Sequence, residues 1–371
     1  MGISSRKPFH ARHCDGPRGL DDRGEARRKP GRGIRNRLIL AALALCAAGP
    51  VLAERLRIAT YNAELSRNGP GLLFRAIQSG KDPQVEAVAD TLAALGPDVL
   101  LLTGFDWDHD LLALRALAAR LSARGQEYPH LFALRPNSGL ASGQDLDGDG
   151  RLGDPRDAQG YGRFLGEGGM ALLSRLPVDR AGVRDFSDLL WADLPGALIA
   201  GAGLSGAAAG VQRLSSTGHW DVPLTLPDGG VLHLWAYHAT PPVFDGPEDR
   251  NGRRNHDETA FWLRYLEAEL PAAPAPAPFV ILGDANLDPD RGEGRHAALR
   301  ALLSHPRVQD VDSGPTVDWS EIGLEGARRV DYVLPSAGVT VVAAGVLRPD
   351  PLGNADPATR HWPVWVDITL P

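Results

Sequence analysis

The sequence predicts an α/β fold in which two packed sheets are flanked by helices. From residue 54 onward, apolar runs of strand length alternate with runs that have helical periodicity. Their order follows no strict strand–helix–strand period, which favours two packed sheets with helices outside them. Some apolar runs are continuous, as expected of strands that are covered on both faces.

The first strand is predicted at residues 56–61, where apolar and polar residues alternate, and it ends at Asn62. A helix is predicted from Pro83, because apolar residues then recur at intervals of three and four until Gly96-Pro97. The apolar run at residues 98–102 predicts the second strand.

The remaining elements are predicted in the same way. Strands are expected at residues 169–173, 231–237, 279–282, 330–334, 339–346 and 364–370, and helices at about 110–124 and 255–270. Loops rich in Gly, Asp, Ala or Pro occupy residues 135–168, 194–210 and 271–278. No loop separates two sets of strands that are each large enough to close a core, so residues 54–371 are predicted to form one domain.

The charge of the chain changes sharply at about residue 53. Residues 1–53 hold 11 Lys and Arg against 4 Asp and Glu, and both cysteines. Residues 54–371 hold 28 basic and 42 acidic residues, no cysteine and a single lysine, Lys81. This composition excludes a cysteine nucleophile, a Cys-ligated zinc and a Gly-Lys-Ser/Thr phosphate loop from the predicted domain. An acidic body repels polyanions, so any contact with nucleic acid must be local or depend on a metal ion.

Residues 1–53 are predicted to be a polar leader and a cleaved signal peptide. Arg35 and Arg37 precede an apolar run at residues 38–48, and Ala53 is a small residue at the expected cleavage position. The run is too short to span a bilayer stably. A twin-arginine signal at Arg27-Arg28 and a buried helix are the alternatives. We expect a secreted or periplasmic protein that has no membrane anchor after cleavage.

Polar side chains gather at the ends of the predicted strands. In chain order they are Asn62, His238, Asp284 with Asn286, Asp331 and His361. The side chains of residues two apart in an extended chain face the same way. Carboxylate and amide oxygens are hard ligands that suit Mg²⁺ or Mn²⁺. Each residue alone is a weak signal, but the set predicts one site.

The motifs that contain these residues resemble those of the endonuclease/exonuclease/phosphatase superfamily. They are Thr60-Tyr61-Asn62, Tyr237-His238, Gly283-Asp284-Ala285-Asn286, Arg329-Val330-Asp331-Tyr332 and His361. The resemblance covers residues 55–371, and the segment at 240–258 makes it closest to a secreted bacterial branch. It implies a four-layer αββα sandwich of two mixed sheets flanked by helices. It also implies a monomeric, metal-dependent phosphoesterase whose substrate is a phosphoester, with nucleic acid among the candidates.

The resemblance implies a role for each motif residue. His361 would be the general base that deprotonates water, and Asp331 would orient its imidazole. Asp284 and Asn286 would position water, phosphate or metal, and His238 would donate hydrogen bonds to the phosphoryl oxygens or the leaving group. A divalent ion, Mg²⁺ or Mn²⁺, would stabilise the charge that develops during in-line attack on phosphorus.

Two positions depart from the family's pattern. Gly104 stands where the family carries a metal-binding Glu, and Arg360 stands in place of the Asp of a Ser-Asp-His motif. Asn62 would contact metal or phosphate, and Glu64 or Asp106 would replace the missing carboxylate. The alternative is that Glu64 and Asp106 are ordinary surface carboxylates. We expect weak, millimolar-range metal binding, about 4 kcal/mol, which a Gly104→Glu change would tighten.

The segment at residues 250–256 supplies further candidates: Arg250, Arg253, Arg254 and His256. Arginine forks match phosphate oxygens, so a local phosphate-binding patch is one interpretation. A loop that is salt-bridged to its acidic neighbours is the other. Asn255, with Glu258 three residues later, predicts a capping box at the start of a helix.

Residues 145–157 resemble a calcium-binding loop. Carboxylates stand at its positions 1, 3 and 5 and a glycine at position 6, namely Asp145, Asp147, Asp149 and Gly150. The twelfth residue is Arg156, which excludes a complete EF-hand. Asp154 or Asp157 would complete a different Ca²⁺ site, and a solvated turn is the alternative.

The sequence leaves three functions open. The motif residues favour a phosphoesterase. Gly104 and Arg360 favour a non-catalytic relative that binds a phosphorylated or polyanionic partner. A Ca²⁺-dependent adhesion module is supported by residues 145–157 alone.

Overall fold

The structure is a computed structural model that describes residues 55–311, 314–323, 326–348 and 359–370. The predicted leader and signal peptide lie outside these residues. All described residues belong to one compact unit. None of their helices combines the length and the apolar character that a membrane span requires.

A six-stranded sheet forms one half of the core. Its strands, in spatial order, are β12 (Thr340–Val346), β13 (Val364–Thr369), β1 (Arg55–Leu65), β2 (Val99–Phe105), β4 (Gly169–Ser174) and β3 (His130–Phe132). β1 runs parallel to β2, and all other neighbours are antiparallel.

A five-stranded sheet forms the other half. Its order is β11 (Asp331–Pro335), β8 (Phe279–Asp284), β7 (Val231–His238), β6 (Gly218–Thr225) and β5 (Arg184–Asp185). β7 runs parallel to β8, and the other pairs are antiparallel. A short separate ribbon consists of β9 (Val317–Asp318) and β10 (Ala327–Arg328).

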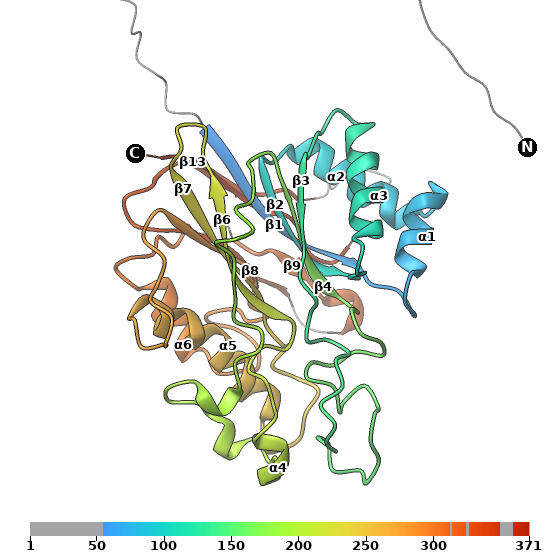
Figure 1. The fold of residues 1–371 in the computed structure, drawn as a ribbon, viewed down its shortest axis with the longest axis vertical. Helices are drawn as coiled ribbons and strands as arrows, with labels where there is room; N and C mark the ends of the chain where they lie inside the picture. Colours follow the sequence, from blue (N-terminus) through green and yellow to red (C-terminus); the bar gives the residue numbers. More distant parts are fainter. Residues whose placement is uncertain (1–54, 312–313, 324–325, 349–358, 371) are drawn as a thin grey trace, which may run out of the picture. The chain divides into compact units, whose positions relative to one another are not determined.

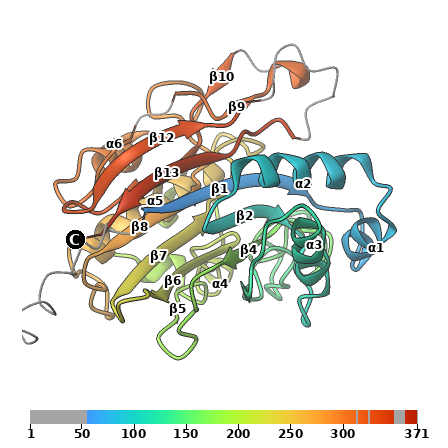
Figure 2. The ribbon, with the colours of Figure 1, turned by 90° about the horizontal axis from the view of Figure 1, so that it is seen from above.

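Helices cover the outer faces of both sheets, as Figure 1 and Figure 2 show. α1 (Leu72–Ser79), α2 (Pro83–Leu95) and α3 (Leu112–Ser122) pack on the six-stranded sheet. α5 (Arg250–Leu266) and α6 (Ala297–Leu303) pack on the five-stranded sheet. Short helical segments lie in the loops, at η1 (Trp191–Asp193), η2 (Ile199–Gly201), α4 (Gly206–Ala209) and η3 (Ser320–Ile322).

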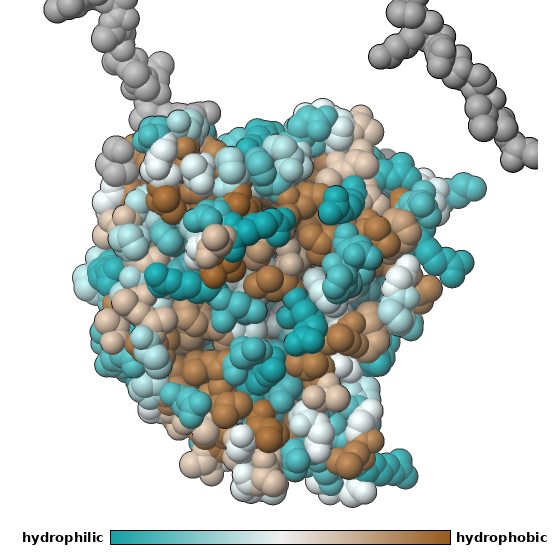
Figure 3. All heavy atoms as spheres, in the orientation of Figure 1, coloured by the Kyte–Doolittle hydropathy of each residue, from teal (hydrophilic) through white to brown (hydrophobic). Residues whose placement is uncertain are grey.

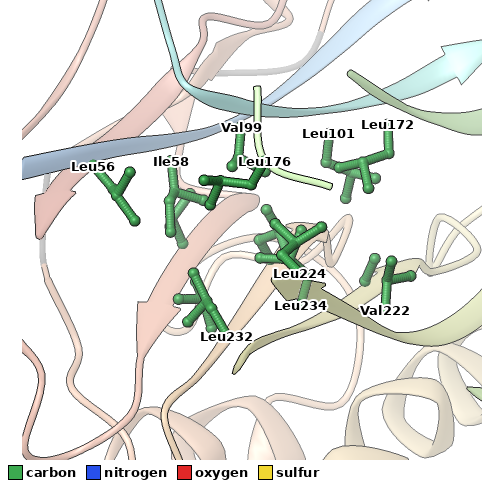
Figure 4. Close-up of a cluster of buried hydrophobic side chains, with 14 of the residues drawn as sticks. Leu56, Ile58, Val99, Leu101, Leu172, Leu176, Val222, Leu224, Leu232 and Leu234 are labelled. Atoms are coloured by element: carbon green, nitrogen blue, oxygen red, sulfur yellow. The ribbon is translucent and has the colours of Figure 1, made fainter. Parts of the chain in front are cut away.

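The apolar core between the sheets explains why they pack face to face. Ile58, Val99 and Leu101 from β1 and β2 point toward Leu224 and Leu234 of β6 and β7 (Figure 4). All five are almost fully buried. Burial of one such side chain contributes about 1.5–3 kcal/mol, so this layer holds the two halves together.

A second cluster fixes α5 against the strands that carry the predicted site. The rings of Trp235 on β7 and Phe279 on β8 are stacked with centroids 4.0 Å apart. Trp262 of α5 also stacks on Trp235, and the centroids of these two rings are 5.6 Å apart. All three side chains are buried, so α5 is held rigidly beside β7 and β8.

The predicted four-layer αββα sandwich is confirmed. The predicted strands that carry motif residues all exist, with boundaries within a few residues. β6 was not predicted, because Gly218 and Pro223 interrupt its apolar pattern and both residues are unusual in strands.

Two local predictions were wrong. β1 does not end at Asn62 but continues to Leu65, with a shift of register between these residues and a left-handed backbone at Glu64 (φ 46°). α5 begins at Arg250, so Asn255 and Glu258 lie inside the helix and form no capping box. The buried carboxylate of Glu258 instead accepts hydrogen bonds from Ser216 and from the backbone of Thr240.

Candidate active site

Strand register brings three motif residues together at one edge of the five-stranded sheet. His238 at the end of β7 is paired with Asp284 at the end of β8, and Asp284 is paired with Asp331 at the start of β11. His238 Nε2 lies 3.5 Å from Asp284 Oδ2. Side chains at paired positions of adjacent strands lie on the same face, so this cluster follows directly from the sheet topology.

Asn62 reaches the same cluster from the other sheet. Its Nδ2 donates to Asp284 Oδ2 over 2.8 Å, and its Oδ1 accepts the backbone N–H of Glu64 over 3.2 Å. Both Asn62 and Asp284 are buried. The site therefore lies between the two sheets, and one direct hydrogen bond joins them there.

His361, which precedes β13, is held by Asp331. The imidazole Nδ1 lies 2.8 Å from Asp331 Oδ2, which also accepts a hydrogen bond from the Thr316 hydroxyl over 3.0 Å. Because a carboxylate only accepts, Nδ1 carries the hydrogen, and Nε2 of the neutral ring is left to take a proton. His361 is 4% exposed, so its orientation is fixed by its surroundings.

Asn286 supports Asp284 rather than standing beside it as an equivalent ligand. Its backbone is left-handed (φ 50°), and its N–H donates to Asp284 Oδ1 over 2.7 Å. Its Nδ2 donates to the carbonyl of Ala239 over 2.9 Å. The segments that follow β7 and β8 are thereby joined one residue beyond His238.

Asn255 of α5 adds a second link between these segments. Its Nδ2 donates to the carbonyl of Thr240 over 2.8 Å and to that of Ala285 over 2.7 Å. Asn255 is fully buried. It fixes the backbone directly after His238 and Asp284, so it positions both side chains without touching either.

Burial and neighbouring charges shift the pKa values of three groups in the site. Burial raises the pKa of Asp284 to about 7, and Asp331 adds to the rise. Burial lowers the pKa of His238 to about 4. For His361, burial acts downward, but the charge and hydrogen bond of Asp331, with further help from Asp284, raise its pKa to about 9. Asp331 and Asp284 thus favour the protonated form of His361, whereas burial favours the neutral form of His238.

The residues of the site fit a divalent cation. Asp284, Asp331 and His361 each offer one ligand atom, and these atoms lie within 4.8 Å of one another. Among the described residues, Asp331 Oδ1 has no hydrogen-bond partner although it is buried. A buried carboxylate oxygen without a donor is costly unless a cation satisfies it. Oxygen donors of this kind suit Mg²⁺ or Mn²⁺.

Glu64 and Arg360 form an ion pair at the rim of the site. Glu64 Oε2 accepts the backbone N–H of Arg360 over 2.8 Å, and Oε1 accepts Nε over 2.8 Å and also Nη2. The charge of Glu64 contributes to the raised pKa of His361. Glu64 is therefore close enough to act on the site electrostatically, but its oxygens are engaged by Arg360.

The structure does not bring Asp106 into the site. Its buried carboxylate accepts hydrogen bonds from the Ser66 hydroxyl and from the backbone N–H groups of Arg67 and Gly168. These contacts hold the segment after β1 and the segment before β4, so the expectation that Asp106 replaces the missing carboxylate is corrected.

The environment of Gly104 corrects a second expectation. Gly104 has a left-handed backbone (φ 63°), and a Cβ placed there would collide with Asn62 Oδ1. Asn62 cannot move freely, because Asp284 and the backbone of Glu64 hold its amide. A Gly104→Glu change would therefore displace Asn62 and strain the backbone instead of simply supplying a ligand.

The proposed arginine patch also needs correction, because residues 250–256 are helical. Arg254 is buried and donates to four backbone carbonyls, and Arg253 donates to that of Glu248. Arg250 donates to the carbonyls of Ala202 and Leu146, and His256 Nδ1 contacts Asp257. These side chains anchor α5 to its surrounding loops, so neither a phosphate patch nor a salt-bridged loop describes them.

The acidic loop brings together three of its five candidate carboxylates. Ligand oxygens of Asp145, Asp147 and Asp149 lie within 4.8 Å of one another. Asp154 is not in this group, and it accepts the backbone N–H of Arg156. Asp157 is buried and holds the loop through the backbone N–H groups of Leu146 and Gly153.

Thr316 and Asn255 are site residues that the sequence did not reveal as such. Thr316 accepts the N–H groups of Val330 and Asp331 and donates to the Asp331 carboxylate. Thr316 lies in no motif, and the capping box expected at Asn255 indicated a helix end instead of a role in the site. Only the packing of distant segments shows their role.

Comparisons with known proteins agree with the fold. The sequence profile of the Endonuclease/Exonuclease/phosphatase family matches residues 59–353. No curated protein sequence gives a significant match.

Solved structures share the fold at low sequence identity. An endonuclease/exonuclease/phosphatase from Beutenbergia cavernae is 20% identical, with a TM-score of 0.53 over 85% of this chain and 72% of that one. The family protein from Leptotrichia buccalis is 16% identical, with a TM-score of 0.50 over 85% of this chain and all of that one. The human Nocturnin catalytic domain with bound sulfate is 12% identical, with a TM-score of 0.51 over 85% of this chain and 94% of that one. The chain belongs to the endonuclease/exonuclease/phosphatase family, whose members are metal-dependent phosphoesterases.

Proposed function

We propose that the protein is an exported, metal-dependent phosphoesterase, a nuclease or phosphatase, that uses a His361-activated water for in-line attack on phosphorus. The observation that carries this proposal is the hydrogen bond of 2.8 Å between His361 and Asp331, beside the buried side chains of Asp284 and Asn62 and the partly buried His238. A base with an orienting carboxylate, next to hard oxygen ligands, is the arrangement that phosphoester hydrolysis needs.

Each residue has a distinct task in this mechanism. Asp331 holds Nδ1 of His361, so that Nε2 accepts the proton of the attacking water. Asn62 and Asn286 fix the two oxygens of Asp284. His238 is neutral because its pKa is low, and its ring N–H donates to a phosphoryl oxygen or to the leaving group.

The divalent ion would be held by Asp284 and Asp331 Oδ1, with Asn62 beside them. When bound, it supplies positive charge that stabilises the phosphoryl oxygens in the transition state. Because Gly104 adds no carboxylate and Arg360 engages Glu64, we propose that metal affinity is in the millimolar range.

A second function is favoured by the same ion pair. If Glu64 cannot leave Arg360, the site lacks a carboxylate that the family pattern contains, and the protein would bind a phosphorylated or polyanionic partner without hydrolysing it. The two functions predict opposite results in an assay of turnover.

Three further features belong to the proposal. Residues 1–53 would direct the chain out of the cytoplasm, the domain would act as a monomer, and Asp145, Asp147 and Asp149 would bind Ca²⁺ apart from the catalytic ion. Ca²⁺ takes about six to eight oxygen ligands, so backbone carbonyls and water would complete the shell around these three carboxylates.

Hydrolysis of bis(p-nitrophenyl) phosphate and p-nitrophenyl phosphate tests the main proposal. We expect the metal-free protein to be inactive and Mg²⁺ or Mn²⁺ to restore turnover. Ca²⁺ alone should restore less, because its longer bonds and looser geometry fit the site poorly. Binding of phosphate without turnover under any of these conditions would favour the non-catalytic relative.

A further inference from the structure

A groove of about 840 Å³ is lined in part by the chain segment that follows His238. Its walls come from the excursion at residues 145–161, which belongs to the green loops below β4 in Figure 1, and from the segment between β7 and α5. Thr240, two residues beyond His238, lies in its lining, and Asn255 ties Thr240 to Ala285. The groove and the site therefore share the segment that follows β7, and the volume of the groove is in the range of small-molecule sites.

Two aromatic side chains line this groove and are open to solvent. Tyr161 is 66% exposed and Phe244 is 80% exposed. In the part of the chain that the structure describes, no other Phe, Trp or Tyr is exposed. On the face of the molecule in Figure 3, hydrophobic and hydrophilic side chains are interspersed. Phe244 also has a left-handed backbone (φ 70°), a costly conformation for a residue other than glycine that often marks a functional position.

The charges around the groove are balanced. Its lining contains three arginines and three carboxylates, namely Arg156, Arg250, Arg254, Asp147, Asp245 and Glu248. Balanced charges give no net attraction for a polyphosphate chain or for a cationic head group. Exposed rings instead offer flat surfaces on which another ring can stack.

We propose that this groove is a subsite for a neutral planar ring of the nucleobase class. The ring is part of the phosphoester substrate, whose phosphorus is attacked by the water that His361 activates. This inference rests on the proposed function, and it narrows the substrate to nucleotide esters rather than lipid or sugar phosphates. Tyr161 and Phe244 provide the stacking surfaces, and the phosphate lies toward His238.

Two esters with the same leaving group test the subsite. They are thymidine 5′-(p-nitrophenyl phosphate) and methyl p-nitrophenyl phosphate, which differ only in the group that the groove would hold. We expect Tyr161→Ala and Phe244→Ala each to raise KM for the thymidine ester roughly 5- to 150-fold, the effect that corresponds to one lost base-stacking contact. KM for the methyl ester should stay unchanged. Leu152→Ala is the matched control, because Leu152 is 70% exposed in the same excursion but does not line the groove.

Equilibrium binding separates this inference from the proposed activity. Thymidine 5′-monophosphate is titrated into the wild-type full chain and the two aromatic variants in EDTA, by calorimetry. Binding that weakens in both variants supports the subsite even if the wild type hydrolyses nothing, in which case only the proposed function fails. Equal binding by all three proteins overturns the subsite. A KM that rises for p-nitrophenylphosphorylcholine but not for the thymidine ester also overturns it, because the groove would then recognise a cation.

Discussion

The carboxylate of Glu64 is bound by both the backbone N–H and the guanidinium of Arg360, a residue 296 positions later in the chain. Arg360 stands where the family pattern has a carboxylate. It neutralises the charge of Glu64, which is the group best placed to compensate for the carboxylate missing at Gly104. We therefore expect metal affinity in this site to depend on whether Glu64 contacts Arg360 or the ion.

The first prediction is that Arg360→Ala tightens metal binding. Loss of the guanidinium frees Glu64 to contribute its charge to the site, and the Mg²⁺ concentration for half-maximal activity should fall on the order of tenfold, or about 1.4 kcal/mol. Magnesium titration of turnover measures this effect, with Arg115→Ala as a surface control. Loss of all activity in Glu64→Ala would contradict this account, because it would show that Glu64 already binds the ion in the wild type.

The second prediction concerns the chemical step. His361→Ala and Asp284→Ala should each lower kcat/KM roughly 10²- to 10⁴-fold, the usual contribution of a positioned base or ligand. The exposed His109 provides a control substitution, His109→Ala, that should leave turnover unchanged. Circular dichroism should show that all three variants are folded. Full activity of purified His361→Ala would refute the assigned role.

The third prediction is a pH dependence of stability in the absence of metal. The pKa of His361 is raised from 6.5 to about 9 in the folded protein. Between these values the folded state binds more protons than the unfolded state, so the free energy of unfolding falls as pH rises. Tm should decline from pH 7.5 to 9.5 in the wild type and decline less in His361→Gln. Parallel declines in both proteins would show that His361 gains no proton affinity on folding.

The same group gives the direction of the activity profile. His361 acts as a base only after it loses its proton, so turnover should rise with pH on the acidic side of the profile. A bound divalent cation adds positive charge nearby and lowers the pKa of His361. The midpoint should therefore lie below 9 at saturating Mg²⁺ and should move upward when Mg²⁺ is limiting.

The fourth prediction tests the positioning role of Asn255. Asn255→Asp removes both donors, leaves the carbonyls of Thr240 and Ala285 unpaired, and should destabilise the fold by roughly 1–3 kcal/mol for each buried group. Among molecules that remain folded, kcat should fall more than KM rises, because the ends of β7 and β8 lose their alignment. The control is Asn68→Asp on the surface. An equal loss of stability with unchanged kcat would show that Asn255 has only a structural role.

The fifth prediction concerns the acidic loop. Ca²⁺ at a hundredfold excess over its dissociation constant should stabilise the folded protein by roughly 2.7 kcal/mol and raise Tm. Asp147→Ala should remove this rise. Asp154→Ala is the matched control and should retain it, because Asp154 lies outside the carboxylate group. A wild-type Tm that does not respond to Ca²⁺ would indicate a solvated turn.

Strand positions were predictable from the sequence because the buried strands are short, nearly continuous apolar runs that end in polar residues. This pattern placed His238, Asp284 and Asp331 at strand ends, and the family resemblance supplied their order in the site. The start of α5 was not predictable in the same way. Asn255 and Glu258 have the spacing of a capping box, but their side chains bind distant backbone groups.

Contacts between segments far apart in the chain were beyond local patterns. The pairing of Glu64 with Arg360 depends on the left-handed bulge at the end of β1, and no periodicity marks such a bulge. No sequence pattern marks the left-handed backbone of Gly104 either. That a Cβ at this position would collide with Asn62 is evident only from the structure.

The hydrogen bond between Asn62 and Asp284 crosses from one sheet to the other. The alignment of the reacting groups is therefore set by how the two sheets register against each other, and the apolar layer around Leu101 and Leu234 sets that register. A slide of the sheets by about 1 Å would stretch a bond of 2.8 Å beyond useful length. Small core substitutions should accordingly lower turnover before they measurably lower the stability of the fold. The apolar core between the sheets is therefore part of the proposed catalytic mechanism.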